Sequence, residues 1–407
     1  MRRAALVLVV AALALVWVGT PVTRAKQSST LPLSALRAVL KARSDAQRDK
    51  NRDAYAATID PQAPATFRDA QLKSFDGLAS LPVARINYSI DAKGVDLTRG
   101  VDPSKYANAP VALVATTRAL RFTYDARSSL DSLFWTFVKR GTHWYVGGDD
   151  DVADLGLETN VSMWDTSPVV VEQSDHFQLI AHPDQAARAR DLLGLAENAL
   201  TTLKGRWQLP WSEKLVGFVP SSPDELSDLI QASVDVTKFV AFVAYGYNPD
   251  TLAGTVPRLY VQDRNLSRYP AGDQTETLVH EFTHAAGSAY ASSFIPSWVH
   301  EGLAEWIRGG PQSRDPRSPG AGDHAPRDDQ FGAGTQGQIV QAYRDAQSLI
   351  ATLSRVAGAN SPFDLFVGLG KDKVRPGAQS YVVDQELTHV GVSGGLAGLE
   401  NDWVGGR

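Results

Sequence analysis

The absence of cysteine is the feature that most limits how this chain of 407 residues can fold and function. Without cysteine there is no disulfide framework, so a hydrophobic core has to hold the folded state together. The apolar fraction of 43% and the charged fraction of 21% are those of a globular protein. The same absence excludes thiol nucleophiles and cysteine-ligated zinc or iron–sulfur sites. Any bound metal must therefore use histidine and carboxylate ligands.

The charge balance argues against nucleic acid as a partner. The chain carries 40 basic and 45 acidic residues, and its net charge of −5 offers no general attraction to a polyanion. A chain of this length predicts two or three domains. Nothing in the sequence specifies an oligomeric state.

The first 25 residues have the layout of a signal peptide. Met1–Arg3 is positively charged, Ala4–Gly19 is uninterrupted apolar sequence, and Thr23-Arg24-Ala25 provides a small-residue cleavage site. The alternative is a retained membrane anchor, because the apolar run is only slightly shorter than the about 20 residues that span a bilayer. Either interpretation places the remaining chain outside the cytoplasm, secreted or associated with the membrane through this segment.

Residues 33–150 combine helical and strand periodicity. A helical repeat covers 33–59 and 67–75, and β-branched and aromatic residues then dominate 84–90, 111–122 and 133–146. Helices followed by an antiparallel sheet make an α+β arrangement. This order of elements resembles the cystatin-like fold of nuclear transport factor 2-like domains, in which a curved antiparallel sheet surrounds an N-terminal helix. This part of the sequence has no ionisable cluster that indicates catalysis, so we expect an accessory domain that serves as a binding module or as a spacer.

Residues 168–407 predict a second unit of mixed α/β structure. Strand character is found in 169–171, 176–180, 215–219 and 258–262, and helices are expected to begin near Pro183 and Ser222. Residues 309–337 are rich in glycine, proline and aspartate and predict a long loop. Helical periodicity returns in 338–356 and 382–387, so the C-terminal part is expected to be helical.

His280 and His284 are the first candidates for metal ligands. They are the first and last residues of the segment His-Glu-Phe-Thr-His, and positions four apart on a helix project from the same face. The surrounding apolar residues predict a buried helix, and Asp273–Glu276 has the form of a capping box at its start. The alternative is a pair of histidines on an amphipathic surface helix.

A catalytic zinc site needs a third protein ligand and an open position. The segment 295–306 predicts a second helix, because Pro296 suits the first turn of a helix. Glu301 and Glu305 are four residues apart and therefore share one face of this helix. His300 competes with Glu301 as the ligand. Adjacent helix residues point about 100° apart, so only one of the two can face the metal.

The two segments together, His-Glu-x-x-His followed by Trp-x-x-Glu-Gly-x-Ala-Glu, resemble the gluzincin clan of zinc metallopeptidases, most closely its bacterial peptidase-MA-like branch. The resemblance implies a zincin-like domain over 168–407 that binds Zn²⁺ through His280, His284 and Glu301. It also implies that Glu305 orients one metal-binding histidine, which fits the general need for an acceptor on the distal imidazole nitrogen.

The predicted function is an exported zinc metallopeptidase that acts on peptide or protein substrates. Glu281 is the expected general base for a zinc-bound water. Tyr343 is the candidate donor to the oxyanion, with packing in a core as its alternative. Arg258–Gln262 is the candidate edge strand for pairing with an extended substrate, with ordinary sheet structure as its alternative. Two other functions stay open, a binding protein without turnover and a zinc amidase acting on cell-wall peptides.

Overall fold

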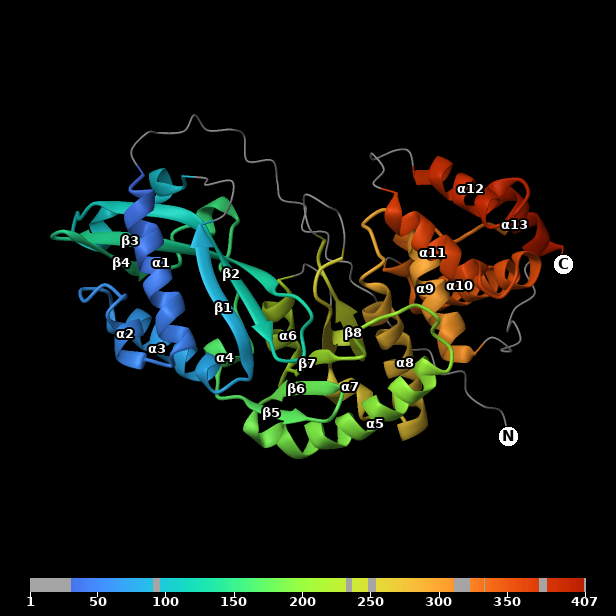
Figure 1. Ribbon diagram of the computed structural model, residues 1–407, viewed down its shortest axis with the longest axis horizontal. Helices are drawn as coiled ribbons and strands as arrows, with labels where there is room; N and C mark the ends of the chain where they lie inside the picture. The colour runs from blue at the N-terminus through green and yellow to red at the C-terminus, as the bar shows by residue number, and fades with distance from the viewer. Residues whose placement is uncertain are drawn as a thin grey trace.

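The computed structural model describes residues 31–90, 96–231, 236–247, 254–310, 323–332, 334–372 and 379–405. The predicted signal segment and residues 311–322 and 333 of the predicted loop lie outside these ranges. A four-stranded sheet with its helices lies at one end, a five-stranded sheet in the middle, and a group of helices at the other end (Figure 1). The expected α+β class, with a curved antiparallel sheet and a helical C-terminal part, is confirmed.

Three helices precede the first sheet: α1 (Leu33–Arg48), α2 (Arg52–Ala56) and α3 (Ala65–Ala79). The prediction of one continuous helix over 33–59 is wrong. Lys50 has a φ of 51°, in the left-handed region that ends helices, and the Asn51 side chain accepts a hydrogen bond from the Ala54 amide. This cap starts α2 as a separate helix.

The first sheet is antiparallel in the order β1-β2-β3-β4. Its strands are β1 (Val83–Ile90), β2 (Val111–Phe122), β3 (Ser129–Arg140) and β4 (His143–Gly148). Burial along β2 follows the two-residue repeat of a strand with one face on the core. Leu36 and Leu40 of α1 belong to the same buried core as Ile86 of β1 and Phe137 of β3. The sheet therefore packs against α1.

The second sheet has the order β5-β6-β7-β9-β8. Its strands are β5 (Val170–Gln173), β6 (Phe177–Ala181), β7 (Leu215–Val219), β8 (Ala241–Ala244) and β9 (Arg258–Val261). The prediction that 258–262 forms an edge is wrong, because β9 lies between β7 and β8. Residues 241–244 form a short, fully buried strand without polar alternation, and this strand returns antiparallel along β9 to become the edge.

Helices pack on both faces of the second sheet. The helices around it are α4 (Met163–Thr166), α5 (Ala186–Lys204), α6 (Pro223–Ile230), α7 (Asp263–Leu266) and α8 (Ala271–Gly287). Helices α5 and α8 pack on one face, and α4 and α6 pack on the other. Leu192 of α5 and Leu278 of α8 share one core with Leu179 of β6. The prediction of a capping box at Asp273–Glu276 is wrong, since Pro270 precedes a helix that already begins at Ala271.

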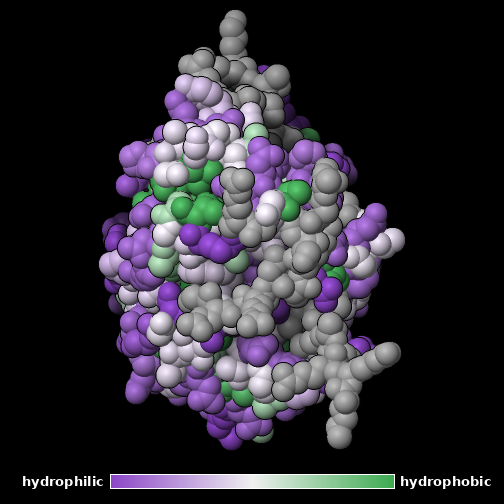
Figure 2. Space-filling model, turned by 90° about the vertical axis from the view of Figure 1, so that its right-hand side faces the viewer, coloured by the Kyte–Doolittle hydropathy of each residue, from purple (hydrophilic) through white to green (hydrophobic). Residues whose placement is uncertain are grey.

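The C-terminal part consists of α9 (Ser297–Gly309), α10 (Gln336–Ala357), α11 (Ser361–Lys371), α12 (Gln379–His389) and α13 (Gly395–Val404). Helix α9 begins one residue later than predicted, because Pro296 precedes the first turn. Hydrophilic residues predominate among the coloured atoms of this end of the molecule, as expected for a solvent-facing layer (Figure 2). No helix in the described ranges is long and apolar enough to cross a membrane.

A buried histidine joins the segment before β5 to α6. His182 Nδ1 lies 2.9 Å from the carbonyl oxygen of Pro168, and its Nε2 lies 2.8 Å from Glu225 Oε1. Both partners are acceptors, so only the doubly protonated ring donates to both. Burial lowers the pKa of His182, but the hydrogen bonds to Pro168 and Glu225 outweigh burial and raise it above its ordinary value.

We expect the His182 contacts to make the free energy of unfolding depend on pH. A group whose pKa is raised by folding contributes its full stability below the unfolded pKa of about 6.5. This contribution is lost as the pH rises through the higher folded-state pKa. Urea unfolding of the wild type from pH 6 to pH 9 should show that decrease, and His182→Gln should show a flatter profile. Identical profiles for the two proteins would contradict this account.

Candidate metal centre

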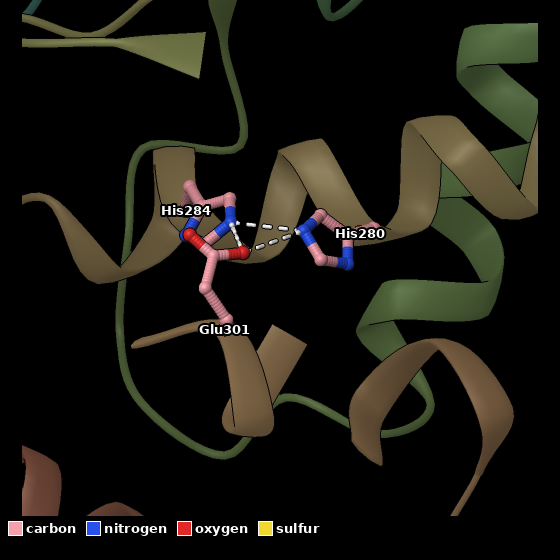
Figure 3. A group of neighbouring side chains, drawn as sticks. All are labelled: His280, His284 and Glu301. Atoms are coloured by element: carbon pink, nitrogen blue, oxygen red, sulfur yellow. Dashed lines mark hydrogen bonds and ion pairs between the residues drawn. The ribbon is translucent and has the colours of Figure 1, made fainter. Parts of the chain in front are cut away.

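Helix α8 presents His280 and His284 from one face, a single turn apart, toward α9 (Figure 3). Their Nε2 atoms are 3.1 Å apart. The helix is buried because it lies between the second sheet and the C-terminal helices. Phe282, which projects from the opposite side, stacks on Phe177 of β6 with ring centroids 4.8 Å apart. The apolar side of α8 thus fixes both imidazoles.

Glu301 of α9 completes the group. Its Oε2 lies 3.3 Å from His280 Nε2 and 3.5 Å from His284 Nε2 (Figure 3). All three residues are at most 4% exposed, and together they could hold a metal ion. Burial lowers the pKa of His280, but Glu301 and Glu305 outweigh it and raise the pKa to about 10. The local field therefore favours positive charge.

His300 lies outside this group. Its ring packs edge-on against Phe366, with centroids 5.1 Å apart at 90°, and its centroid is 6.3 Å from that of His284. Its Nε2 is buried without a hydrogen-bond partner among the described residues. Of the two adjacent candidates for the third ligand, the structure brings Glu301 to the histidines.

Glu305 lies one turn after Glu301 on α9. Its Oε1 is 3.0 Å from His280 Nδ1, and its Oε2 is 2.5 Å from the Arg308 guanidinium. Burial raises the pKa of Glu305, but Arg308 and His280 outweigh burial and lower it. Glu305 is therefore held ionised beside His280 Nδ1, in an ion-pair contact rather than a well-aligned hydrogen bond. A proton on Nδ1 would leave Nε2 for a metal.

Removing the charge of Glu305 should weaken metal binding. Glu305→Gln is expected to reduce metal affinity about 10–100-fold, the range found when the outer partner of a metal-binding histidine is lost. Competition with a chromophoric chelator measures this affinity. Arg308→Lys keeps the positive charge beside Glu305 and should have a smaller effect. An unchanged affinity in Glu305→Gln would show that this carboxylate does not support His280.

Glu281 points toward β8 rather than into the group of three. Its Oε2 accepts a hydrogen bond of 2.7 Å from the Val243 amide, and its Oε1 is buried without a partner in the described part of the chain. Burial raises the pKa of Glu281 to about 8. Val243 is opposite Leu259 in a pair whose backbone groups point away from β9, so its amide is free for Glu281.

Two tyrosines border the group. Tyr343 of α10 has its ring centroid 6.3 Å from that of His280, and its hydroxyl finds no hydrogen-bond partner of good geometry among the described residues. Burial and the negative charge of Glu301 raise its pKa well above the ordinary value. Tyr245, which follows β8, has its pKa raised by burial, by a neighbouring tyrosine and by Glu301. No signal in the sequence identifies Tyr245, because only the course of β8 brings it here.

Gly302 permits α9 to approach α10. A Cβ atom at this position would lie 2.5 Å from the Ala346 carbonyl oxygen and 2.8 Å from Ile350 Cγ1. Both neighbours belong to α10, and backbone cannot move aside as a flexible side-chain end can. The glycine after Glu301 is therefore needed for the helix packing that positions Glu301.

We expect Gly302→Ala to decrease the free energy of unfolding by about 1–3 kcal/mol, as overpacking of a tight contact does. Urea unfolding measures the change. Gly194→Ala in α5 is the matched control, since no atom lies within 4 Å of the added methyl group. That substitution should be stabilising by about 0.5–1 kcal/mol, because alanine favours the helix. Equal effects at the two positions would exclude a packing role for Gly302.

Comparison with known proteins does not identify a family. No protein-family model and no curated protein sequence matches this chain. The geometry and charge of the group around His280 are therefore the basis for a functional proposal.

Proposed function

We propose that this protein is a zinc metallopeptidase of the gluzincin type, with residues 168–407 forming a zincin-like domain. The observation that carries the proposal is the triangle of His280 Nε2, His284 Nε2 and Glu301 Oε2, with edges of 3.1, 3.3 and 3.5 Å. Tetrahedral zinc with bonds of 2.0–2.1 Å separates its ligands by about 3.3 Å. Two imidazoles and one carboxylate also suit zinc better than calcium or magnesium, which prefer oxygen ligands.

Zinc bound in this group would polarise the substrate carbonyl and lower the pKa of a bound water to about 7. Glu281 is beside the ligands with Oε1 free, so it would accept a proton and later donate it to the leaving amine. The Tyr343 hydroxyl would donate a hydrogen bond to the developing oxyanion. Glu281 is 0% exposed, so a substrate must displace neighbouring groups to reach it.

The outer edge of β8 supports a peptide as the substrate. Ala241 and Val243 occupy the pairs of the β8–β9 ladder whose amide and carbonyl groups point away from β9. The Val243 amide already donates to Glu281 Oε2, so an extended peptide would add to this edge through the Ala241 backbone groups and the Val243 carbonyl, and would lie alongside Glu281. The substrate edge in this proposal is β8, in place of the strand at 258–262.

Metal analysis of the purified full chain tests the assignment of zinc. After loading with zinc and dialysis against metal-free buffer, the protein should retain about one ion per chain, as a three-ligand site does. Calcium and magnesium should not compete. A protein that retains no zinc at pH 7, or releases it to millimolar magnesium, would overturn the proposal.

A further inference from the structure

The turn between β2 and β3 connects the first sheet to the second. The Asp125 carboxylate binds the Arg258 guanidinium of β9 through two hydrogen bonds of 2.5 and 2.7 Å. The side chains of this ion pair are 3% and 9% exposed. Arg127 of the same turn donates a hydrogen bond of 3.2 Å to the Gly254 carbonyl. A buried, two-pronged pair of this kind fixes direction as well as distance.

Apolar packing continues across the same junction. Phe122, the last residue of β2, contacts Trp164 edge-on with ring centroids 6.0 Å apart, and Trp164 lies 6.5 Å from Phe218 of β7. These rings belong to one buried core that includes residues of both sheets. The turn carrying Asp125 is therefore anchored by a core and is not a loose extension.

The register of the second sheet connects Arg258 to Glu281. Arg258 is directly opposite Ala244 of β8. Val243, the residue before Ala244, donates its amide to Glu281. Strand β9 has four residues, Arg258–Val261, and β8 pairs only with β9 within the described ranges. Beyond the Arg258–Ala244 pair the Thr255 amide still bonds the Gly246 carbonyl. Arg258 therefore belongs to the short ladder that holds the edge strand and lies one pair away from Val243.

We propose that the N-terminal unit positions Glu281, and that Asp125 and Arg258 are the positioning residues that achieve this. Asp125 keeps Arg258 buried at the end of β9, and this keeps β8 in the register that presents the Val243 amide to Glu281. Without Asp125, Arg258 is an uncompensated buried charge that must turn toward water. The catalytic consequence rests on the proposed peptidase function, whereas the positional claim does not.

Site-resolved hydrogen exchange of the Val243 amide in the full chain tests the positional claim without any substrate. Asp125→Asn should accelerate this exchange at least about tenfold, because local opening of the edge strand becomes easier. Ser129→Ala is the matched control at the end of the same turn, because the Ser129 hydroxyl bonds the Leu120 carbonyl within the first sheet, and it should leave the exchange unchanged. If Asp125→Asn does not fold, Arg258→Lys is the second variant, because it keeps the charge and loses the two-pronged contact. Its exchange should be faster than in the wild type by less than the factor expected for Asp125→Asn. Unchanged Val243 exchange in the folded variant would overturn the proposal.

A second readout separates this proposal from the peptidase assignment. In Asp125→Asn the zinc affinity should stay as in the wild type, because its ligands lie on α8 and α9, while kcat for a peptide should fall more than KM changes. Faster Val243 exchange together with no cleavage by any variant would support the positional claim and count against the peptidase. A loss of zinc affinity equal to the loss of kcat would overturn it, because the effect would then be general unfolding.

Discussion

Replacing Glu281 with glutamine is expected to reduce the rate of peptide hydrolysis about 10²–10⁴-fold while zinc stays bound. Glutamine has the shape of glutamate and keeps an oxygen for the Val243 amide, but it cannot take a proton from water. Zinc should be retained because Glu281 points toward β8 and is not part of the triangle formed by His280, His284 and Glu301.

The Glu281→Gln variant should also be at least as stable as the wild type. Burial disfavours the ionised carboxylate and raises the pKa of Glu281 to about 8, and a neutral amide avoids this penalty. Zinc stoichiometry, urea unfolding and steady-state hydrolysis of one peptide measure the three properties. Full activity in a zinc-loaded Glu281→Gln protein would exclude Glu281 as the general base.

Substitution of Glu301 by alanine is expected to remove zinc binding, whereas alanine at the neighbouring His300 leaves it intact. Glu301 supplies the third ligand atom of the triangle. Its loss should weaken zinc binding by more than the loss of an outer contact does, which is about 10–100-fold. His300 packs against Phe366 and does not reach the triangle.

The two alanine variants lie side by side on α9 and are controls for each other. Competition titration with a chelator gives the zinc affinity of each, and circular dichroism verifies that both are folded. Retention of zinc by Glu301→Ala together with its loss from His300→Ala would reverse the ligand assignment.

Much of the fold is predictable because burial imposes a period on the sequence. The two-residue alternation of β2 and the flanking turns identify the first sheet, and the spacing of apolar residues identifies α5 and α10. Strand β8 is not predictable in this way. Its four residues, Ala241–Ala244, are all buried and show no alternation, so only pairing with β9 distinguishes them from any short apolar run.

Some residues of the candidate site are predictable from a local pattern, and others depend on contacts between distant segments. His280 and His284 are predictable because their relation is set by one turn of one helix. Glu301 depends on how two helices pack, and the sequence supplies it only through the resemblance to gluzincins. The contact of Asp125 with Arg258 joins residues 133 positions apart, and Val243 is 38 positions from Glu281. Such contacts follow from topology and leave no local pattern.

Mass spectrometry of a mixed peptide library incubated with the zinc-loaded protein tests the central claim most directly. New peptide termini are expected to accumulate with time, to cease forming when a chelator removes the metal, and to form again when zinc is restored. Zinc bound through His280, His284 and Glu301 with no cleavage of any peptide would contradict the peptidase assignment and indicate a binding or structural metal centre.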